Sequence, residues 1–374
     1  MRDGAIFSAD FGFPPVLHID FSIESFQLFS WNLQRQVFRY SGEYDDRSTI
    51  RISYTCIFVH IVRLDIERMQ DKQLTVICDS SCNFMDSEVN ARLAELGLGD
   101  IIAYESVPLS IICDGIDTVD DASLDLQALL DHSKKAKHTG TSCPSVGSFV
   151  SAFQSAPSKD VICVTISANV SGSYQAAVTA RDIALSSDPT RRIIVIDSAS
   201  AGAQVEYAID RVFLCDGNGD GDVPMSLMGA ARKNELLEVA SSRLTDTLAH
   251  SSVLYRLSSF GNLVKGGRLP RIVGALASGL NIRIIGGAEY GRLTMVSKAK
   301  GDKRAVREIY RLMAESRWDE QRLFIDYVGD DGRKVADMIA SGCACASVEI
   351  RPCRGLCSYY AEEGGVIVGF GTKR

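Results

Sequence analysis

Short apolar runs alternate with helix-like segments from Leu74 onward, and this alternation constrains the fold more than any other feature of the chain. The runs Leu74–Cys78, 161–167 and Arg192–Asp197 have the compact apolar character of buried strands. Val107–Ile112 is predicted as a further strand, followed by a turn at Asp114-Gly115. Helices are predicted between the strands, at Ser87–Leu96, at Ser123–Ser133, from Pro144 and at Gly172–Leu185. This alternation favours a parallel sheet covered by helices on both faces.

The pattern changes after about residue 225. A helical stretch at Met225–His250 precedes a strand at Ser252–Arg256, a helix at Arg271–Leu280 and a strand at Ile282–Ile285. A hairpin strand (290–298), a helix (302–316), a strand (322–328), a helix (330–341) and strands at Ser347–Arg351 and Val366–Phe370 are expected next. We therefore predict an α/β fold with a parallel three-layer α/β/α subdomain at 74–225 and a smaller mixed-sheet α/β subdomain at 226–372.

Two serine-rich segments stand where helices are expected to begin. In Thr141-Ser142-Cys143-Pro144-Ser145, Pro144 suits the first position of a helix. In Ser171-Gly172-Ser173-Tyr174-Gln175, Ser171 follows a strand and suits the N-cap. Helix N-termini favour anions, and ligands of parallel sheets bind at the carboxyl ends of the strands. The pair predicts capture of a small anionic group by hydroxyls and amides, although helix capping alone also explains each serine.

The composition argues against several classes of protein. A net charge of −7 does not favour a nucleic-acid-binding surface. No apolar run approaches the roughly 20 residues that span a bilayer, so no integral membrane segment is expected. The N-terminal residues lack the basic and then apolar pattern of a secretory signal. The 11 cysteines, an odd number scattered along the chain, are typical of reduced thiols in the cytoplasm, where we expect this protein.

Two segments invite a metal-binding interpretation, but neither has the required pattern. Cys343, Cys345, Cys353 and Cys357 lack the usual spacing of a zinc site. The segment 216–222 is similar to the start of an EF-hand loop, but Leu227 stands where that loop needs a bidentate glutamate. We expect a flexible acidic loop at 216–222, no metal and no cofactor.

The motifs together show a resemblance to one family. From about Leu74 to Phe370 the chain resembles the DegV family, whose members bind long-chain fatty acids. The similar segments, in order, are Leu74–Ser80 with its final Asp-Ser, 141–145 with Cys143 in place of a glutamine, 166–175, Val195–Ser198, Lys265–Leu269, and Leu280–Arg283 followed by Ile284 where proline is common. The order and spacing of these motifs, rather than any one of them, carry the resemblance.

The resemblance implies two α/β domains with an acyl chain enclosed between them. It implies that Thr141 and Ser171 hold the carboxylate, with Ser142 and Gly172 beside them. The family often has a histidine near its C-terminus that reaches the carboxylate, and Tyr360 falls at that position here. A phenol can donate the same hydrogen bond, but it carries no positive charge. Glu362-Glu363 replaces a Gly-Pro pair of the family, which alters the loop after Tyr360.

The resemblance also implies a partner. Related bacterial proteins hand the fatty acid to a separate ATP-dependent kinase, which makes an acyl phosphate for phospholipid synthesis. Catalysis would then reside in the partner, and this chain would be a non-catalytic lipid-binding subunit. Arg268 and Lys265, on a glycine-rich turn, are candidates to contact the phosphate or the kinase, with a solvated turn as the other interpretation. The basic residues Lys298, Lys300 and Arg304 are expected to form a solvated face or a partner surface.

Two other classes of function compete with lipid binding. A serine hydrolase using Ser171 or Ser142 needs a base, but no G-x-S-x-G elbow is present. None of the histidines, which are His18, His60, His132, His138 and His250, stands in a recognisable triad context. A phosphate- or nucleotide-binding regulator using Lys265–Arg268 is the main alternative, although neither G-x-G-x-x-G after the first strand nor a P-loop occurs.

Residues 1–70 lie outside the resemblance. They are rich in aromatic residues but lack a sustained helix or strand period. Met69 stands shortly before the first strand, so we expect that translation begins there. A genuine N-terminal extension that docks on the body of the protein is the alternative.

Overall fold

The computed structural model describes residues 72–214, 227, 231, 235–269 and 281–374. The 1–70 extension, the start at Met69, the acidic loop 216–222 and the helix Arg271–Leu280 lie outside the described residues. The described part of the chain contains three sheets, which have four, six and three strands. In that part, no helix combines the length and apolar character needed to cross a membrane.

The four-stranded sheet is parallel throughout. Its strands are β2 (Ile102–Val107), β1 (Leu74–Asp79), β6 (Asp160–Thr165) and β7 (Arg192–Asp197). Every residue of β1 is buried, because helices cover both faces of the sheet. The carboxyl ends of β1, β6 and β7 carry Asp79, Ser167 and Asp197 close to one edge of the sheet.

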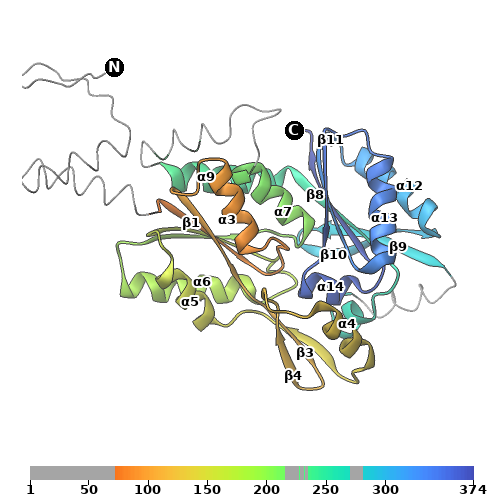
Figure 1. The fold of residues 1–374 in the computed structure, drawn as a ribbon, viewed down its shortest axis with the longest axis horizontal. Helices are drawn as coiled ribbons and strands as arrows, with labels where there is room; N and C mark the ends of the chain where they lie inside the picture. The colour runs from red at the N-terminus through yellow and green to blue at the C-terminus, as the bar shows by residue number, and fades with distance from the viewer. Residues whose placement is uncertain (1–71, 215–226, 228–230, 232–234, 270–280) are drawn as a thin grey trace, which may run out of the picture. The chain divides into compact units, whose positions relative to one another are not determined.

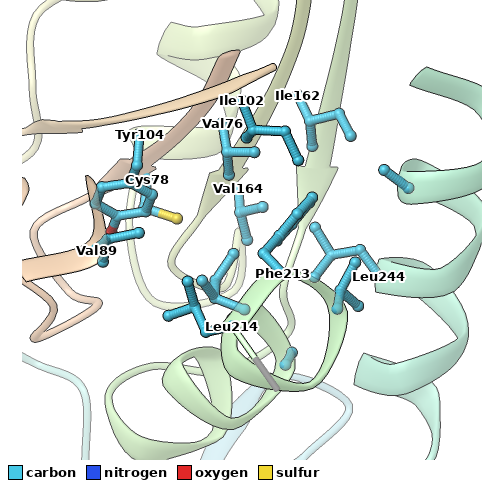
Figure 2. Close-up of a cluster of buried hydrophobic side chains, with 14 of the residues drawn as sticks. Val76, Cys78, Val89, Ile102, Tyr104, Ile162, Val164, Phe213, Leu214 and Leu244 are labelled. Atoms are coloured by element: carbon cyan, nitrogen blue, oxygen red, sulfur yellow. The ribbon is translucent and has the colours of Figure 1, made fainter. Parts of the chain in front are cut away.

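Two helical layers cover this sheet. One face packs on α5 (Val146–Ser155) and α6 (Ser173–Ser187) through Phe149, Phe153 and a row of α6 alanines. The other face packs on α3 (Asp86–Glu95), α7 (Ala203–Ile209), the π-helical turn η1 (Asp210–Leu214) and α9 (Leu236–Ala249). Figure 2 shows Val76, Ile162 and Val164 of the strands meeting Phe213 and Leu244 from this layer. The expected three-layer α/β/α arrangement is confirmed.

The six-stranded sheet is mixed. Its strands are β10 (Arg292–Lys300), β9 (Ile282–Glu289), β8 (Ser251–Leu257), β13 (Val366–Thr372), β11 (Trp318–Tyr327) and β12 (Ser347–Pro352). The pair β11–β12 is parallel and the other neighbours are antiparallel. Helices α12 (Asp302–Glu315) and α13 (Gly329–Ser341) lie on one face (Figure 1). The fully buried helix α7 packs against β8, β11 and β13, so it joins the parallel and mixed sheets.

A small antiparallel sheet was not expected from the sequence. It consists of β4 (Ile116–Val119), β3 (Ser110–Cys113) and β5 (Thr139–Ser142), with α4 (Leu126–Lys135) between β4 and β5. The predicted single strand Val107–Ile112 is wrong: β2 ends at Val107 and β3 begins at Ser110. Pro108 lies between them and has no N–H for a ladder, which explains the break.

Both predicted helix starts in the serine-rich segments also need correction. Helix α5 begins at Val146, and Ser145 is its N-cap, with Ser145 Oγ accepting from Ser148 N at 3.0 Å. Pro144 therefore precedes the helix instead of opening it. Helix α6 begins at Ser173 with Gly172 at the N-cap position, one residue later than expected. Three short helices of the described residues, α7, α10 (Gly261–Lys265) and α14 (Gly355–Ala361), were not predicted.

Candidate functional site

An apolar cavity lies between the parallel and mixed parts of the fold. Its volume is about 110 Å³, several times the roughly 10–15 Å³ that one water molecule needs. Strand β8, the β9–β10 hairpin, α14 and β13 form one wall, and the loops after β6 and β7, with Thr141 of β5, form the other. The apolar part of the lining includes Val253, Leu257, Leu263, Leu293, Leu356 and Ile367. This arrangement suits a hydrocarbon chain.

Thr141 is held at the cavity by the small sheet. Strand β5 pairs with β3, where Thr141 lies opposite Ile111. Thr141 Oγ1 and the Tyr360 hydroxyl are 2.7 Å apart and form a hydrogen bond in which either can be the donor. Both residues line the cavity, so two hydroxyl groups meet at one place in its wall. The structure thus brings the predicted Thr141 and Tyr360 together.

Ser171 reaches the same cavity from the loop between β6 and α6. Its N–H donates to Ser167 O at 3.1 Å, and its Oγ accepts from Ser173 N at 3.2 Å. The neighbouring Gly172 lies close to the other serine-rich segment, because a Cβ on Gly172 would stand 3.3 Å from Cys143 Sγ. The two serine-rich segments therefore lie side by side.

Arg268 supplies a positive charge to the lining. The turn after α10 contains Gly267, whose φ of +72° is a left-handed conformation that glycine adopts without strain. This turn directs Arg268 back, so that its Nε donates to Val170 O at 3.2 Å and its guanidinium lies 5.9 Å from the centre of the Tyr360 ring. Arg268 is half-buried beside the hydroxyl cluster, where it can attract an anion.

The loop that follows Tyr360 is tied to the arginine turn. Glu362, which has a φ of +54°, accepts a hydrogen bond from Asn262 N of α10 at 2.9 Å. Asn262 Nδ2 in turn donates to Tyr359 O at 2.8 Å. Glu362 therefore joins α14 to α10, and so holds Tyr360 and Arg268 in one local structure.

Three predicted site residues do not line the cavity. Ser142 and Gly172 are exposed beside Thr141 and Ser171, and Ser142 Oγ donates to its neighbour Cys143 O at 3.2 Å. Lys265 is exposed at the end of α10. The histidines in the described part of the chain, His132, His138 and His250, also lie outside the cavity lining.

The β9–β10 hairpin is a part of the site that was not predicted from the sequence. Ser167 Oγ donates to Gly291 O at 2.6 Å, and Asn169 Nδ2 donates to Tyr290 O at 2.8 Å, so the tip of the hairpin is fastened to the loop after β6. Gly291 has a φ of +73° and a Cβ there would stand 2.4 Å from Ser167 Oγ. A hairpin strand was expected at 290–298, but nothing in the sequence indicated its contact with the loop after β6.

Cysteines and acidic side chains do not assemble a metal site in the described residues. Cys343 and Cys345 have their sulfur atoms 2.9 Å apart beside the core of the mixed sheet. Cys353 and Cys357 are buried in a different cluster, near the cavity. The four cysteines therefore do not converge on one point.

The fold and cavity define a class of protein: a two-part α/β protein with a largely apolar cavity that has hydroxyl groups in its wall. The family model described as "Uncharacterised protein, DegV family" matches residues 73–219 and 225–367. A DegV domain-containing protein of Streptococcus pneumoniae is 31% identical over 300 residues, which cover 79% of this chain and 98% of that relative. The chain belongs to the DegV family.

Two solved structures of this family resemble the chain closely in fold. A DegV family protein from Eubacterium eligens, loaded with heptadecanoic acid, has a TM-score of 0.68 and 28% identity, over 80% of this chain and 100% of that one. The Fatty Acid Kinase (Fak) B3 protein of Streptococcus pneumoniae, loaded with linoleic acid, has a TM-score of 0.67 and 29% identity, with the same coverage. The expected two-domain DegV fold is thus confirmed.

Proposed function

We propose that this protein binds a long-chain fatty acid in the cavity and presents its carboxylate to a partner kinase in the cytoplasm. The carboxylate lies at Thr141, Tyr360 and Ser171, and the acyl chain lies along the apolar lining. The observation that carries this proposal is the meeting of the Thr141 and Tyr360 hydroxyls at 2.7 Å in the wall of a largely apolar cavity. The fatty acids bound to the two related structures support the same ligand class.

The energetics favour an apolar tail with a hydrogen-bonded head. An acyl chain of about 15 carbons gains roughly 0.8 kcal/mol for each one buried, or on the order of 12 kcal/mol before the costs of ordering. Burying an ionised carboxylate costs several kcal/mol unless hydrogen bonds compensate. The hydroxyl groups and the guanidinium of Arg268 offset this cost, so the tail provides affinity and the polar cluster sets the direction of the ligand.

The polar cluster also supports a non-catalytic role for this chain. Its hydroxyls can hold a carboxylate, but no histidine stands among the cavity-lining residues of the described segments to act as a base. Arg268 is placed to neutralise a phosphoryl group arriving at the carboxylate, and the exposed Lys265 is placed to contact the partner. The similarity to the Fak B3 protein supports a fatty acid kinase as that partner.

Native mass spectrometry of the purified protein, followed by denaturing lipid extraction, tests the proposal. We expect one fatty acid per chain, and its mass reports the preferred chain length. A protein that carries no lipid and takes up neither oleate nor palmitate would contradict the proposal. Retention of a nucleotide in place of a lipid would favour the phosphate- or nucleotide-binding alternative.

Removing one head-group hydroxyl tests whether the hydroxyls act mainly in presenting the carboxylate or in retaining the lipid. Ser171→Ala and Thr141→Ala are expected to weaken presentation of the carboxylate to a fatty acid kinase more than they weaken lipid retention, because the acyl chain keeps its apolar contacts. Kinase-coupled phosphorylation and native mass spectrometry measure the two properties. Ser151→Ala, on the exposed side of α5, is the control. A variant that folds normally but loses all bound lipid would contradict this prediction.

A further inference from the structure

The end of β1 holds the Ser171 side of the cavity. Asp79, the last residue of β1, is 1% exposed. One oxygen, Asp79 Oδ2, accepts from Ile166 N at 2.9 Å and from Ser173 Oγ at 2.6 Å. These two donors stand at the two ends of the loop that carries Ser171. A single carboxylate oxygen therefore closes this loop at both ends.

The next residue, Ser80, holds the Tyr360 side. Ser80 is fully buried, and its Oγ donates to Asp120 Oδ2 at 2.9 Å while accepting from Leu109 N at 3.0 Å. Asp120 then accepts from Gly355 N at 2.9 Å and from Leu356 N at 3.0 Å, in the first turn of α14. Because α14 carries Tyr360, the chain from Ser80 through Asp120 fixes where the Tyr360 hydroxyl lies.

Both carboxylates depend on these hydrogen bonds in the interior. Burial raises the pKa of Asp79, and hydrogen bonds from Ser173, Ser81 and Ile166 N act against that rise. Burial also raises the pKa of Asp120, opposed first by the charge of Arg354 and then by Leu356 N, Ser80 and Gly355 N. A buried carboxylate with several directed donors holds those donors in one geometry.

We propose that Asp79, Ser80, Asp120 and Ser173 are positioning residues that set the separation of Ser171 from the Thr141–Tyr360 pair and thereby select a carboxylate head group. None of the four lines the cavity, so they act through the residues that do. Asp79 at the end of β1 and Ser80 directly after it control the two sides of the head-group site, so the spacing is set where this buried strand ends. This inference rests on the proposed function.

The test compares two ligands that share a tail and differ in the head. Dissociation constants are measured for palmitic acid and for hexadecanol with the full-length protein and its Ser173→Ala and Ser80→Ala variants. Each variant is expected to weaken palmitic acid about ten-fold, since a hydrogen bond to a charged group is misplaced, and to change hexadecanol by no more than about two-fold. Ser133→Ala removes a buried serine whose hydroxyl bonds only within α4, and is the matched control.

The outcomes separate a positioning role from a general structural one. If a variant weakens both ligands in proportion, or leaves the preference for the acid unchanged, the inference is overturned. Hydrogen exchange provides a second readout: faster exchange at the amides of Val170 and Ser171 is expected in Ser173→Ala, and unchanged exchange there would also overturn it. Ser173→Thr, which keeps the hydroxyl, is expected to restore the preference. A wild-type protein that binds neither ligand would contradict the proposed function, whereas one that binds both ligands equally would overturn only the inference.

Discussion

Two consecutive tyrosines illustrate how the site depends on single residues. Tyr359 donates to Thr139 Oγ1 at 2.8 Å, and the hydroxyl of Tyr360 lies 2.7 Å from Thr141 Oγ1. Both pairs join α14 to β5, but Tyr359 is fully buried and only Tyr360 lines the cavity. The same kind of hydroxyl contact therefore lies in the packed interior at one position and in the cavity wall at the next.

Tyr360→Phe is expected to weaken fatty acid binding about five- to ten-fold, because one hydrogen bond to the carboxylate is lost while the ring remains in place. Tyr359→Phe is the matched control and is expected to lower the free energy of unfolding by about 1 kcal/mol without changing fatty acid affinity. Isothermal titration calorimetry and urea unfolding measure the two effects. Equal losses of affinity in both variants would show that Tyr360 acts only through packing.

At the scale of elements, helix α7 and strand β13 pack so closely that no side chain fits between them at Gly369. A Cβ on Gly369 of β13 would stand 2.2 Å from Ala203 O and 2.6 Å from Gln204 N, which are backbone atoms of α7. Backbone atoms in a buried helix cannot move aside cheaply. Glycine at this position is thus a requirement for the contact between the helix and the mixed sheet.

Gly369→Ala is expected to lower the free energy of unfolding by about 1–3 kcal/mol, as overpacked cores do. Gly140→Ala in β5 is the control, because a Cβ there has no neighbour within 4 Å, and its expected change lies within about 0.5 kcal/mol. Urea unfolding followed by circular dichroism measures both variants. Similar stability of the two variants would mean that α7 shifts to accommodate the methyl group.

At the scale of the whole described unit, buried acids join the two halves of the fold. Glu206 of α7 and Asp326 of β11 both accept from Asn83 Nδ2, at 2.8 and 2.6 Å. Burial raises the pKa of both carboxyls, and each is further affected by the other's charge or hydrogen bond. Asp210, in the turn after α7, pairs with Arg322 of β11 at 2.7 Å. Burial outweighs this pairing and raises the pKa of Asp210 to about 6.

The raised pKa of Asp210 predicts that the free energy of unfolding depends on pH. Its pKa is raised in the folded state above the usual 3.8, so the bound proton stabilises the fold. That contribution is complete below about pH 4 and is lost as the pH rises through about 6. In this range the free energy of unfolding falls by at most about 1.4 kcal/mol per pH unit. Urea unfolding of the wild type and Asp210→Asn between pH 4 and 7 measures it. The wild type should lose stability relative to the variant over this range, and parallel curves would contradict the prediction.

The sequence predicted those elements whose pattern is strong over their whole length. Strand β7 was predicted at its observed bounds, Arg192–Asp197, because a continuous apolar run of this length is typical of a strand in a covered sheet. Strand β5 was not predicted, because Thr139-Gly140-Thr141-Ser142 has no apolar alternation. It becomes a strand through its pairing with β3, which is a tertiary contact. The helices α10 and α14 were missed because so few residues show no helical period.

The amino-acid sequence by itself determined the alternation of strands and helices, the two serine-rich segments and the family. Tertiary structure alone decided that Thr141 meets Tyr360, which is 219 residues away, and that Asp79 closes the Ser171 loop. The physical reason lies in the range of each effect. Hydrophobic periodicity is a local property that can be read along the chain. Contacts between distant side chains depend on how the layers pack, and no local pattern encodes that packing.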